Sequence, residues 1–365
     1  MTTVNLRRTP LYDAHVALQA RMVGFGGFEM PVQYAGVLRE HDAVRRRAGL
    51  FDLSHMGQFV LRGAEIGEWA DELTVNEVAT MRPWQARYNL FCSENGGTHD
   101  DVIFYRQDED EWLLVVNAGN ARKMWGILQA RRRSGITLEN NHGTHALIAI
   151  QGPRSAEIVE RLVSPADRES IVAMRYYFCA RTVVAGIPAL MARTGYTGED
   201  GFEMFVPNDD ALALWDALLE AGVSHGLEPC GLGARDVLRL EAGMPLYGHE
   251  LEEDITPLQA GLAWAVKFGK PSFEGKIALE AQRVADDYPR IAGFTLEGRA
   301  PQPRMGYRVF ANGVDVGEVR SGALGFGTAL IDVSAAKPGS QLEIEIRDRR
   351  WAATVVKLPF YKRSK

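Results

Sequence analysis

Apolar and polar residues follow two different patterns along the chain, and the change between them falls near Asp287. Before that point, segments in which apolar residues recur every three or four positions alternate with short apolar runs bounded by Gly, Pro, Asn or Asp. The first pattern is typical of helices and the second of strands. After that point the pattern predicts short strands and turns alone. The chain is therefore expected to have a mixed region followed by a smaller all-β region.

The predicted helices of the mixed region end near glycine or basic residues, as helices commonly do. Thr9 is a capping residue and Pro10 suits a first turn, so we expect the first helix to run from there to about Met22. Asp209 is expected to cap a later helix that reaches Ala221. The remaining helices are expected at 39–47, 63–73, 120–133 and 234–242. One more is expected to follow the turn at Gln151-Gly152-Pro153 and to reach Val163.

The predicted strands of the mixed region are separated by turn segments, with helices between groups of strands. They are expected at 88–92, 101–106, 112–117, 145–150, 181–185, 189–193 and 202–206. Strands joined by turns favour an α+β fold over a doubly wound parallel sheet. The all-β region is expected to contain strands at 291–296, 307–310, 314–320, 328–333, 342–346 and 352–358, with Asn312-Gly313 as a hairpin turn.

This second set of strands predicts a small antiparallel barrel of the Greek-key or jelly-roll kind. The predicted domains are residues 1–282 and 289–365, with the linker between Gln282 and Pro289.

Composition narrows the class of protein. The 365 residues have a formal net charge of −6, so no overall positive field attracts nucleic acid or an anionic membrane. We read no signal peptide and no run of 18 apolar residues, and we expect a cytoplasmic protein. The three cysteines, Cys92, Cys179 and Cys230, are far apart and form no metal-binding spacing, so we expect free thiols and no metal.

Two adjacent carboxylates follow a glycine turn in the segment 94–101. Because side chains alternate along a strand, Asp101, Ile103 and Tyr105 are expected on one face, and Asp100 with Val102 on the other. A carboxylate beside apolar and aromatic neighbours is partly desolvated and suited to binding or moving a proton. The alternative is that both aspartates are solvated turn residues.

The segment 193–203 places three glycines around Tyr196, ahead of a strand whose only acid is Glu203. Glycines permit a flat ligand to approach the backbone, and Tyr196 can stack on its ring. Glu203 is expected either on a solvated face or as a buried hydrogen-bond acceptor. As a buried acceptor it matches an amidine-like ligand edge through two parallel N–H···O bonds.

Arg235 and Arg239 lie four residues apart, on one face of a predicted helix that follows a Gly-rich turn. A cation near a helix start opposes the helix dipole, which suggests that Arg235 has another role, either a ligand contact or an ion pair. His55 is expected to be either a hydrogen-bonded structural histidine or a functional one.

Taken together, these segments resemble the T-protein (aminomethyltransferase) family of the glycine cleavage system. The resemblance covers nearly the whole chain and includes 8–11, 27–34, 49–57, 95–101, 193–201, 233–243 and 357–361. One departure is the segment Ala323–Gly327, which is shorter than usual for the family and has no proline.

The resemblance implies a cloverleaf of two interleaved α+β folate-binding lobes and a C-terminal antiparallel β-barrel. It implies transfer of the methylene carbon from an aminomethyl group on the lipoylated H-protein to tetrahydrofolate, with release of ammonia and formation of 5,10-methylenetetrahydrofolate. Asp101 is then the catalytic carboxylate. The implied tetrahydrofolate-binding residues are Tyr88, Asn117, Tyr196, Glu203 and Arg235, with Met56, Tyr105 and Tyr177 as further candidates.

Two other functions stay open at this point. One is a tetrahydrofolate-dependent demethylase of a small methylated amine or sulfonium, which would use the same pocket without a lipoyl partner. The other is a folate-binding protein without enzymatic activity. No partner among nucleic acids or membranes is expected for any of the three.

Overall fold

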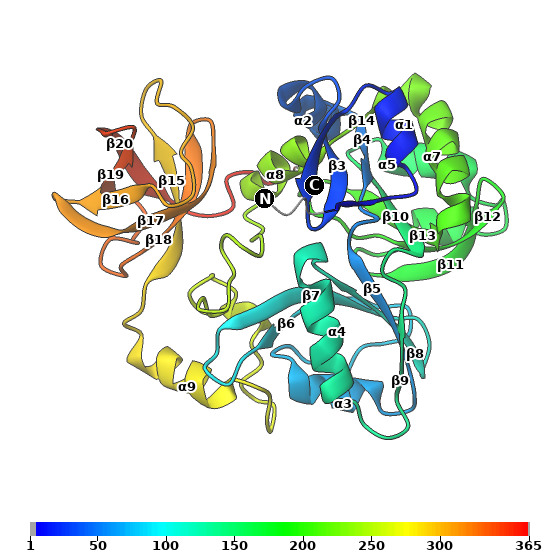
Figure 1. Ribbon diagram of the computed structural model, residues 1–365, viewed down its shortest axis with the longest axis horizontal. Helices are drawn as coiled ribbons and strands as arrows, with labels where there is room; N and C mark the ends of the chain where they lie inside the picture. The colour runs from blue at the N-terminus through cyan, green and yellow to red at the C-terminus, as the bar shows by residue number, and fades with distance from the viewer. Residues whose placement is uncertain (1–4, 364–365) are drawn as a thin grey trace. The chain divides into compact units, whose positions relative to one another are not determined.

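The computed structural model describes residues 5–363, which form two compact units (Figure 1). The first unit contains the described residues up to Trp69, together with Val78–Arg87 and Val102–Leu238. The second contains Ala70–Glu77, Tyr88–Asp101 and the described residues from Arg239 onward. Residues 70–77 and 88–101 therefore belong to a unit whose main part lies much later in the sequence.

A six-stranded sheet forms the main layer of the first unit. Its strand order is β11-β12-β13-β10-β4-β14, antiparallel except for the parallel pair β4 and β14. The strands are β4 (Ala48–Asp52), β10 (His145–Gln151), β11 (Cys179–Val184), β12 (Ile187–Ala192), β13 (Gly201–Pro207) and β14 (Leu227–Pro229).

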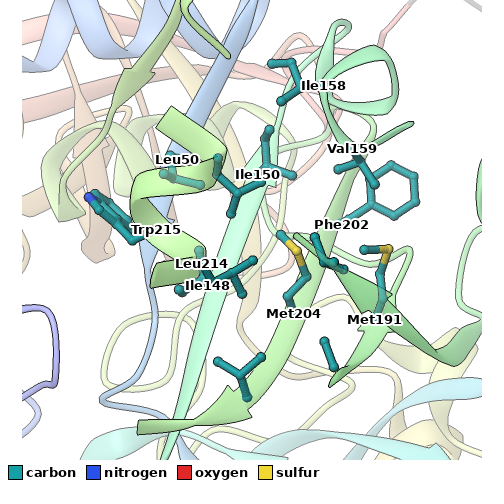
Figure 2. Packing of buried hydrophobic residues seen from close by; sticks show 14 of the residues in the cluster. Leu50, Ile148, Ile150, Ile158, Val159, Met191, Phe202, Met204, Leu214 and Trp215 are labelled. Atoms are coloured by element: carbon teal, nitrogen blue, oxygen red, sulfur yellow. The ribbon is translucent and has the colours of Figure 1, made fainter. Parts of the chain in front are cut away.

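Both faces of this sheet are buried, which is why its central strands are almost continuously apolar. On β10, Ile148 and Ile150 pack with the helices α5 (Ser155–Leu162) and α7 (Asn208–Gly222), in the cluster that includes Trp215 (Figure 2). The alternate residues Leu147 and Ala149 belong to a second cluster on the opposite face. The strand period of two thus divides one apolar run between two cores.

A five-stranded sheet, β6-β7-β8-β5-β9, provides the other wall of this second cluster. Its strands are β5 (Gly57–Arg62), β6 (Ala86–Cys92), β7 (Thr98–Arg106), β8 (Glu111–Val116) and β9 (Thr137–Asn140). Tyr105, Leu113 and Val115 of this sheet share the cluster with Phe205 of β13. The cluster also takes in residues of α2 (Val37–Arg46) and α8 (Leu232–Glu241). Three further helices connect strands along the chain: α3 (Ile66–Leu73) between β5 and β6, α4 (Ala121–Ala130) between β8 and β9, and α6 (Arg168–Val172) between β10 and β11.

The N-terminal segment differs from the predicted long helix. Helix α1 covers only Tyr12–Ala17, and the sheet β1-β3-β2 is built from β1 (Arg7–Arg8), β2 (Arg21–Phe25) and β3 (Phe28–Gln33). Gln19 has a φ of 57°, which ends the helix, and β2 then pairs with β3. The prediction of helix up to Met22 was therefore wrong, because strand pairing overrode the local helical spacing. The strands β3, β4 and β5 were also missed by the sequence pattern.

A buried polar network ties this segment to β4. Asp52 accepts hydrogen bonds from the hydroxyl of Thr9 at 2.7 Å and from the backbone N–H of Ser54 at 2.8 Å. Nε2 of His15 lies 2.9 Å from the same carboxylate, and the hydroxyl of Tyr34 lies 2.9 Å from Nδ1 of that ring. Both oxygens of the buried Asp52 carboxylate therefore have hydrogen-bond partners, which offset the loss of contact with water.

The second unit contains the predicted barrel. Six antiparallel strands close in the order β15-β18-β17-β16-β19-β20, which confirms the all-β prediction for this region. They are β15 (Arg290–Leu296), β16 (Arg308–Ala311), β17 (Val314–Ala323), β18 (Phe326–Ile331), β19 (Gln341–Ile346) and β20 (Arg349–Val356). Asn312 and Gly313 both have positive φ, at 51° and 80°, as a two-residue hairpin turn of the predicted kind requires.

The rest of the second unit packs residues 70–77 and 88–101 against the chain between Leu251 and Leu279. Lys270 is buried here and donates to the carbonyls of Thr74 at 2.6 Å and Asn76 at 3.0 Å. Helix α9 (Lys276–Ala285) continues through Gln282, so the connection to β15 is residues 286–289. The α+β fold class with a C-terminal barrel is confirmed.

Candidate active site

Glu203 is a buried acceptor rather than a solvated acid. It lies on β13 opposite Ala149 and Ala192, whose small side chains leave room for the carboxylate. Its Oε2 atom accepts hydrogen bonds from the hydroxyl of Tyr105, at 3.2 Å, and from the hydroxyl of Thr194. Within the described residues, Oε1 has no such donor. One carboxylate oxygen of Glu203 is therefore fixed by two hydroxyl donors, whereas the other has no donor among the described residues.

Tyr105 is fully enclosed beside this carboxylate. Burial raises the pKa of its phenol well above the usual value, and the charge of Glu203 raises it further. Tyr105 consequently stays protonated and acts as a hydrogen-bond donor. Its ring packs edge-on against Phe205, at a centroid distance of 5.3 Å. Tyr105 is thus a neutral donor that holds Oε2 of Glu203 in place.

The loop from Arg193 to Gly201 is held by ionic contacts at both ends. Arg193 forms a two-pronged contact with Asp200, at 3.0 Å and 2.6 Å, and donates to the carbonyl of Met174 at 2.7 Å. Arg45 donates to Glu199 at 2.8 Å. Such forked contacts restrict the loop more than single bonds do. The loop is therefore preorganised around Tyr196.

Gln151 crosslinks the inside of the same loop. Its amide donates to the carbonyl of Thr194 at 3.1 Å and accepts from the hydroxyl of Thr197 at 2.9 Å. A Cβ atom placed on Gly195 would lie 2.1 Å from this side chain, and one on Gly201 would lie 2.3 Å from it. These two glycines are thus required for close packing, whereas Gly198 of the same loop has a positive φ of 79°.

Arg235 packs against Tyr196, with its guanidinium carbon 4.7 Å from the ring centroid. Among the residues that the structure describes, no carboxylate lies within ion-pairing distance of it. Burial lowers the pKa of Arg235, although Tyr196 and Glu203 partly oppose that effect. Arg239, four residues later, instead forms a buried ion pair with Glu250 at 2.8 Å. Although both arginines lie on the same helix, Arg235 therefore packs on an aromatic ring and Arg239 pairs with a carboxylate.

His55 is buried and uncharged. Burial lowers its pKa to about 4, and Arg235 and His142 lower it while Asp52 opposes them. Its Nδ1 atom has no hydrogen-bond partner within residues 5–363.

The remaining predicted residues of the first unit lie near the cluster between the two sheets. Met56 and Tyr177 pack against that cluster. Asn117 directly follows β8, and the pairing of Gly57 with Val116 sets Asn117 across from Met56. The backbone of Tyr177, at a φ of 63°, bonds to Ala86 and to Arg193.

Asp101 and Tyr88 form a pair in the second unit. They lie on the neighbouring strands β7 and β6, and the hydroxyl of Tyr88 donates to Oδ2 of Asp101 at 3.0 Å. Asp100 is completely buried, whereas Asp101 is partly exposed. The two aspartates therefore have different environments, as strand alternation predicts.

Sequence reasoning missed several residues around these groups. Thr194 bonds to Glu203, and Gln151 and Arg45 bond to the loop around Tyr196; all three are buried or nearly so. The Arg193-Thr194-Gly195 sequence offered a signal for Thr194, because it adjoins the glycine-rich turn. Trp264, which stacks on Tyr88, had no signal in the sequence pattern.

Neither a metal centre nor a membrane span is found in the described part of the chain. Within it, no three His, Cys, Asp or Glu side chains gather in a way that could hold a metal ion. Over the same residues, every helix is too short or too polar to cross a lipid bilayer.

The fold defines a protein with an α+β region followed by a closed barrel. Comparison with known families gives the same division. Residues 11–270 match the GCVT N-terminal domain, and residues 290–362 match the glycine cleavage T-protein C-terminal barrel domain. The chain belongs to the glycine cleavage T-protein family.

Individual relatives match over their full length. The aminomethyltransferase of Geobacillus thermodenitrificans (strain NG80-2) is 43% identical over 367 residues, which is 99% of this chain and 100% of the relative. The aminomethyltransferase of Bacillus mycoides (strain KBAB4) is 43% identical over 370 residues, with the same coverage. The crystal structure of glycine cleavage system aminomethyltransferase T from Bartonella henselae superposes with a TM-score of 0.90. It is 32% identical and covers 98% of this chain and 99% of that one.

Proposed function

We propose that this chain is an aminomethyltransferase that moves the methylene carbon of an aminomethyl group from the dihydrolipoyl arm of H-protein to tetrahydrofolate. The full-length match to relatives that are named aminomethyltransferases supports this activity. The observation that most favours a folate site is the buried Glu203, which receives hydrogen bonds from Tyr105 and Thr194 at one oxygen and from no described residue at the other.

Glu203 fits one edge of a reduced pterin. That edge presents adjacent N–H donors, and a carboxylate accepts from such an edge more strongly than a neutral group does. The neutral, protonated Tyr105 keeps the carboxylate in place without competing for the second oxygen. We therefore assign Glu203 to pterin recognition, with Tyr105 as its support.

Tyr196 and Arg235 fit the flat part of the same ligand. The ring of Tyr196 is backed by the guanidinium of Arg235 and held by the crosslinked loop. A preorganised aromatic surface lowers the entropy that the protein's own loop and side chains lose when a ring binds. Met56, Asn117 and Tyr177 are proposed to complete the folate site from the first unit.

Asp101 is the proposed catalytic carboxylate, oriented by the hydroxyl of Tyr88. Tetrahydrofolate supplies the two nitrogens that receive the carbon. The carbon exchanges its bonds to sulfur and to the amino nitrogen for bonds to these two nitrogens, and two protons pass to the leaving thiolate and amine. No oxidant is needed. Asp101 would stabilise the positive charge that develops on nitrogen during this exchange.

The proposal also includes the partner and the compartment. The donor arm would be presented by lipoylated H-protein, and the protein would act in the cytoplasm. The three cysteines are free and buried, which is the usual state of thiols in a reducing compartment.

The test is Asp101→Asn, assayed with tetrahydrofolate and H-protein loaded with the aminomethyl group. We expect tetrahydrofolate binding to be kept and turnover to fall roughly 100-fold or more. Asp254→Asn, the same change at an exposed acid of the same unit, is the matched control and should leave turnover unchanged. Normal turnover by Asp101→Asn would remove this residue from the reaction. Turnover with a small methylated amine or sulfonium, but none with H-protein, would favour a demethylase.

A further inference from the structure

Trp264 has an exposed side chain that stacks on one member of the Asp101–Tyr88 pair. Its exposed fraction is 60%, yet it stacks on the ring of Tyr88 with a centroid distance of 5.9 Å and an interplanar angle of 27°. The hydroxyl of that same ring donates to Asp101. A continuous chain of contacts therefore runs from an exposed indole through a tyrosine to the proposed catalytic carboxylate, all within the second unit.

The backbone fixes where Trp264 can lie. It is the middle residue of the 3₁₀ turn η3 (Ala263–Ala265), and its neighbours Leu262, Ala265 and Val266 are buried in the core of this unit. The N–H of Lys267 bonds to the carbonyl of Val75 at 2.9 Å, so the chain is also anchored just after the turn. The residues next to Trp264 in sequence pack into the core of the second unit, whereas the indole of Trp264 stacks on Tyr88.

Stacking on Trp264 adds to what holds Tyr88. Its ring packs against the apolar cluster and is only partly buried, so contacts outside that core also act on its orientation. A phenol that swings away by one rotamer no longer reaches a carboxylate oxygen 3.0 Å distant. Stacked aromatic pairs resist that motion because the rings stabilise each other beyond their buried area.

We propose that Trp264 is a positioning residue for the transfer reaction, which holds the ring of Tyr88 in the orientation that keeps its hydroxyl on Asp101. The inference rests on the proposed function, because it assumes that Asp101 is the catalytic carboxylate. It assigns to Trp264 no contact with the substrate.

The test is a double-mutant cycle with Trp264→Ala and Tyr88→Phe, assayed with tetrahydrofolate and aminomethyl-loaded H-protein. Trp264→Ala should lower kcat about 2- to 12-fold, the range expected from the loss of one aromatic pair, and should leave KM for tetrahydrofolate within about 2-fold. Tyr88→Phe should lower kcat roughly 10-fold or more. In the Tyr88→Phe background, Trp264→Ala should cost less than about 2-fold more, because the hydroxyl it positions is already absent.

Two further variants separate positioning from folding. Trp264→Phe keeps a stacking ring and should recover kcat to within about 2-fold of the wild type. Ile277→Ala removes a still more exposed apolar residue of the same unit and should change neither constant. If Trp264→Ala does not fold, Trp264→Leu replaces it in the cycle, with the thermal midpoint measured for each variant.

The inference is overturned if Trp264→Ala leaves kcat unchanged, or if it lowers kcat equally in the wild type and in Tyr88→Phe. It is also overturned if KM rises while kcat stays constant, since the indole would then bind the substrate directly. Asp101→Asn is measured beside these variants. Retained turnover there removes Asp101 from the reaction, and this inference with it, whereas lost turnover there with an unaffected Trp264→Ala defeats this inference alone. Absence of turnover in the wild type defeats the proposed function.

Discussion

Nε2 of His15 lies 2.9 Å from Oδ2 of Asp52, and neither side chain is exposed to solvent. Burial by itself raises the pKa of Asp52, but the hydrogen bond and charge of His15, with the hydrogen bonds of Ser54, outweigh it and lower the pKa below the usual value. The ionised carboxylate is thus part of what fastens the N-terminal segment to β4.

The pH dependence of stability follows from that lowered pKa. The folded state binds the proton of Asp52 less tightly than the unfolded state does, so Asp52 stabilises the fold above its unfolded pKa of about 4. This contribution is lost as the pH falls through the folded value. Urea unfolding from pH 7 to pH 3 should show a decline in the free energy of unfolding that is smaller in Asp52→Asn.

At pH 7, Asp52→Asn should lower the free energy of unfolding by about 1–3 kcal/mol, because a buried partner of His15 and Thr9 is weakened. Asp315→Asn is the matched control. It breaks an exposed contact with Arg308 and should change the free energy of unfolding by less than about 1 kcal/mol. Equal losses in the two variants would contradict a special role for the buried carboxylate.

Lys270 should give a pH dependence of the same sign in the alkaline range. Burial lowers its pKa to about 8, although Asp71 opposes the effect. Between pH 8 and about 10.4 the unfolded state therefore binds more protons at this residue, and stability from Lys270 rises with pH. The difference in free energy of unfolding between the wild type and Lys270→Met should widen in favour of the wild type from pH 7.5 to pH 10. A constant difference would show that Lys270 does not titrate in that range.

Replacement of Glu203 by Gln should weaken tetrahydrofolate binding by roughly 10- to 100-fold, the cost of one charge-assisted hydrogen bond. Calorimetric titration with tetrahydrofolate measures it directly. Tyr105→Phe removes only the support of Glu203 and should have a smaller effect. Unchanged affinity in Glu203→Gln would exclude this carboxylate from pterin recognition.

Arg235 and Arg239 should respond differently to the same replacement. Arg235→Leu should raise KM for tetrahydrofolate about 10-fold with little loss of stability, because its guanidinium contacts Tyr196 and has no carboxylate partner among the described residues. Arg239→Leu should instead lower the free energy of unfolding by about 3–5 kcal/mol, since it leaves Glu250 buried and unpaired. Thermal unfolding and steady-state kinetics of the two variants check both statements.

The sequence was most informative where one local rule decides the outcome. A lone acid in the apolar strand β13 predicted either a solvated or a buried Glu203, and the structure selects the buried acceptor. The Asn312-Gly313 turn was predicted because the hairpin needs two residues with positive φ. Helix α1 was predicted too long, because its end depends on the pairing of β2 with β3, which no local spacing reports.

The parts of the site that sequence reasoning missed depend on contacts between distant segments. Thr194 reaches Glu203 from the preceding strand end, and Gln151 reaches the loop around Tyr196 from β10. Trp264 lies more than 170 residues from Tyr88 in sequence and became visible only through its stacking. The periodicity of apolar residues shows which side chains share one face of a single strand or helix. It therefore predicted the face on which Asp101 lies, but not its hydrogen bond with Tyr88.

The central claim is that carbon moves from a lipoyl-bound aminomethyl group to tetrahydrofolate. Its most direct test is the rate of 5,10-methylenetetrahydrofolate formation by the wild-type protein with aminomethyl-loaded, lipoylated H-protein, with ammonia counted in the same reaction. The account predicts one ammonia released for each methylenetetrahydrofolate formed. Absence of both products, with tetrahydrofolate bound and H-protein fully loaded, would contradict it.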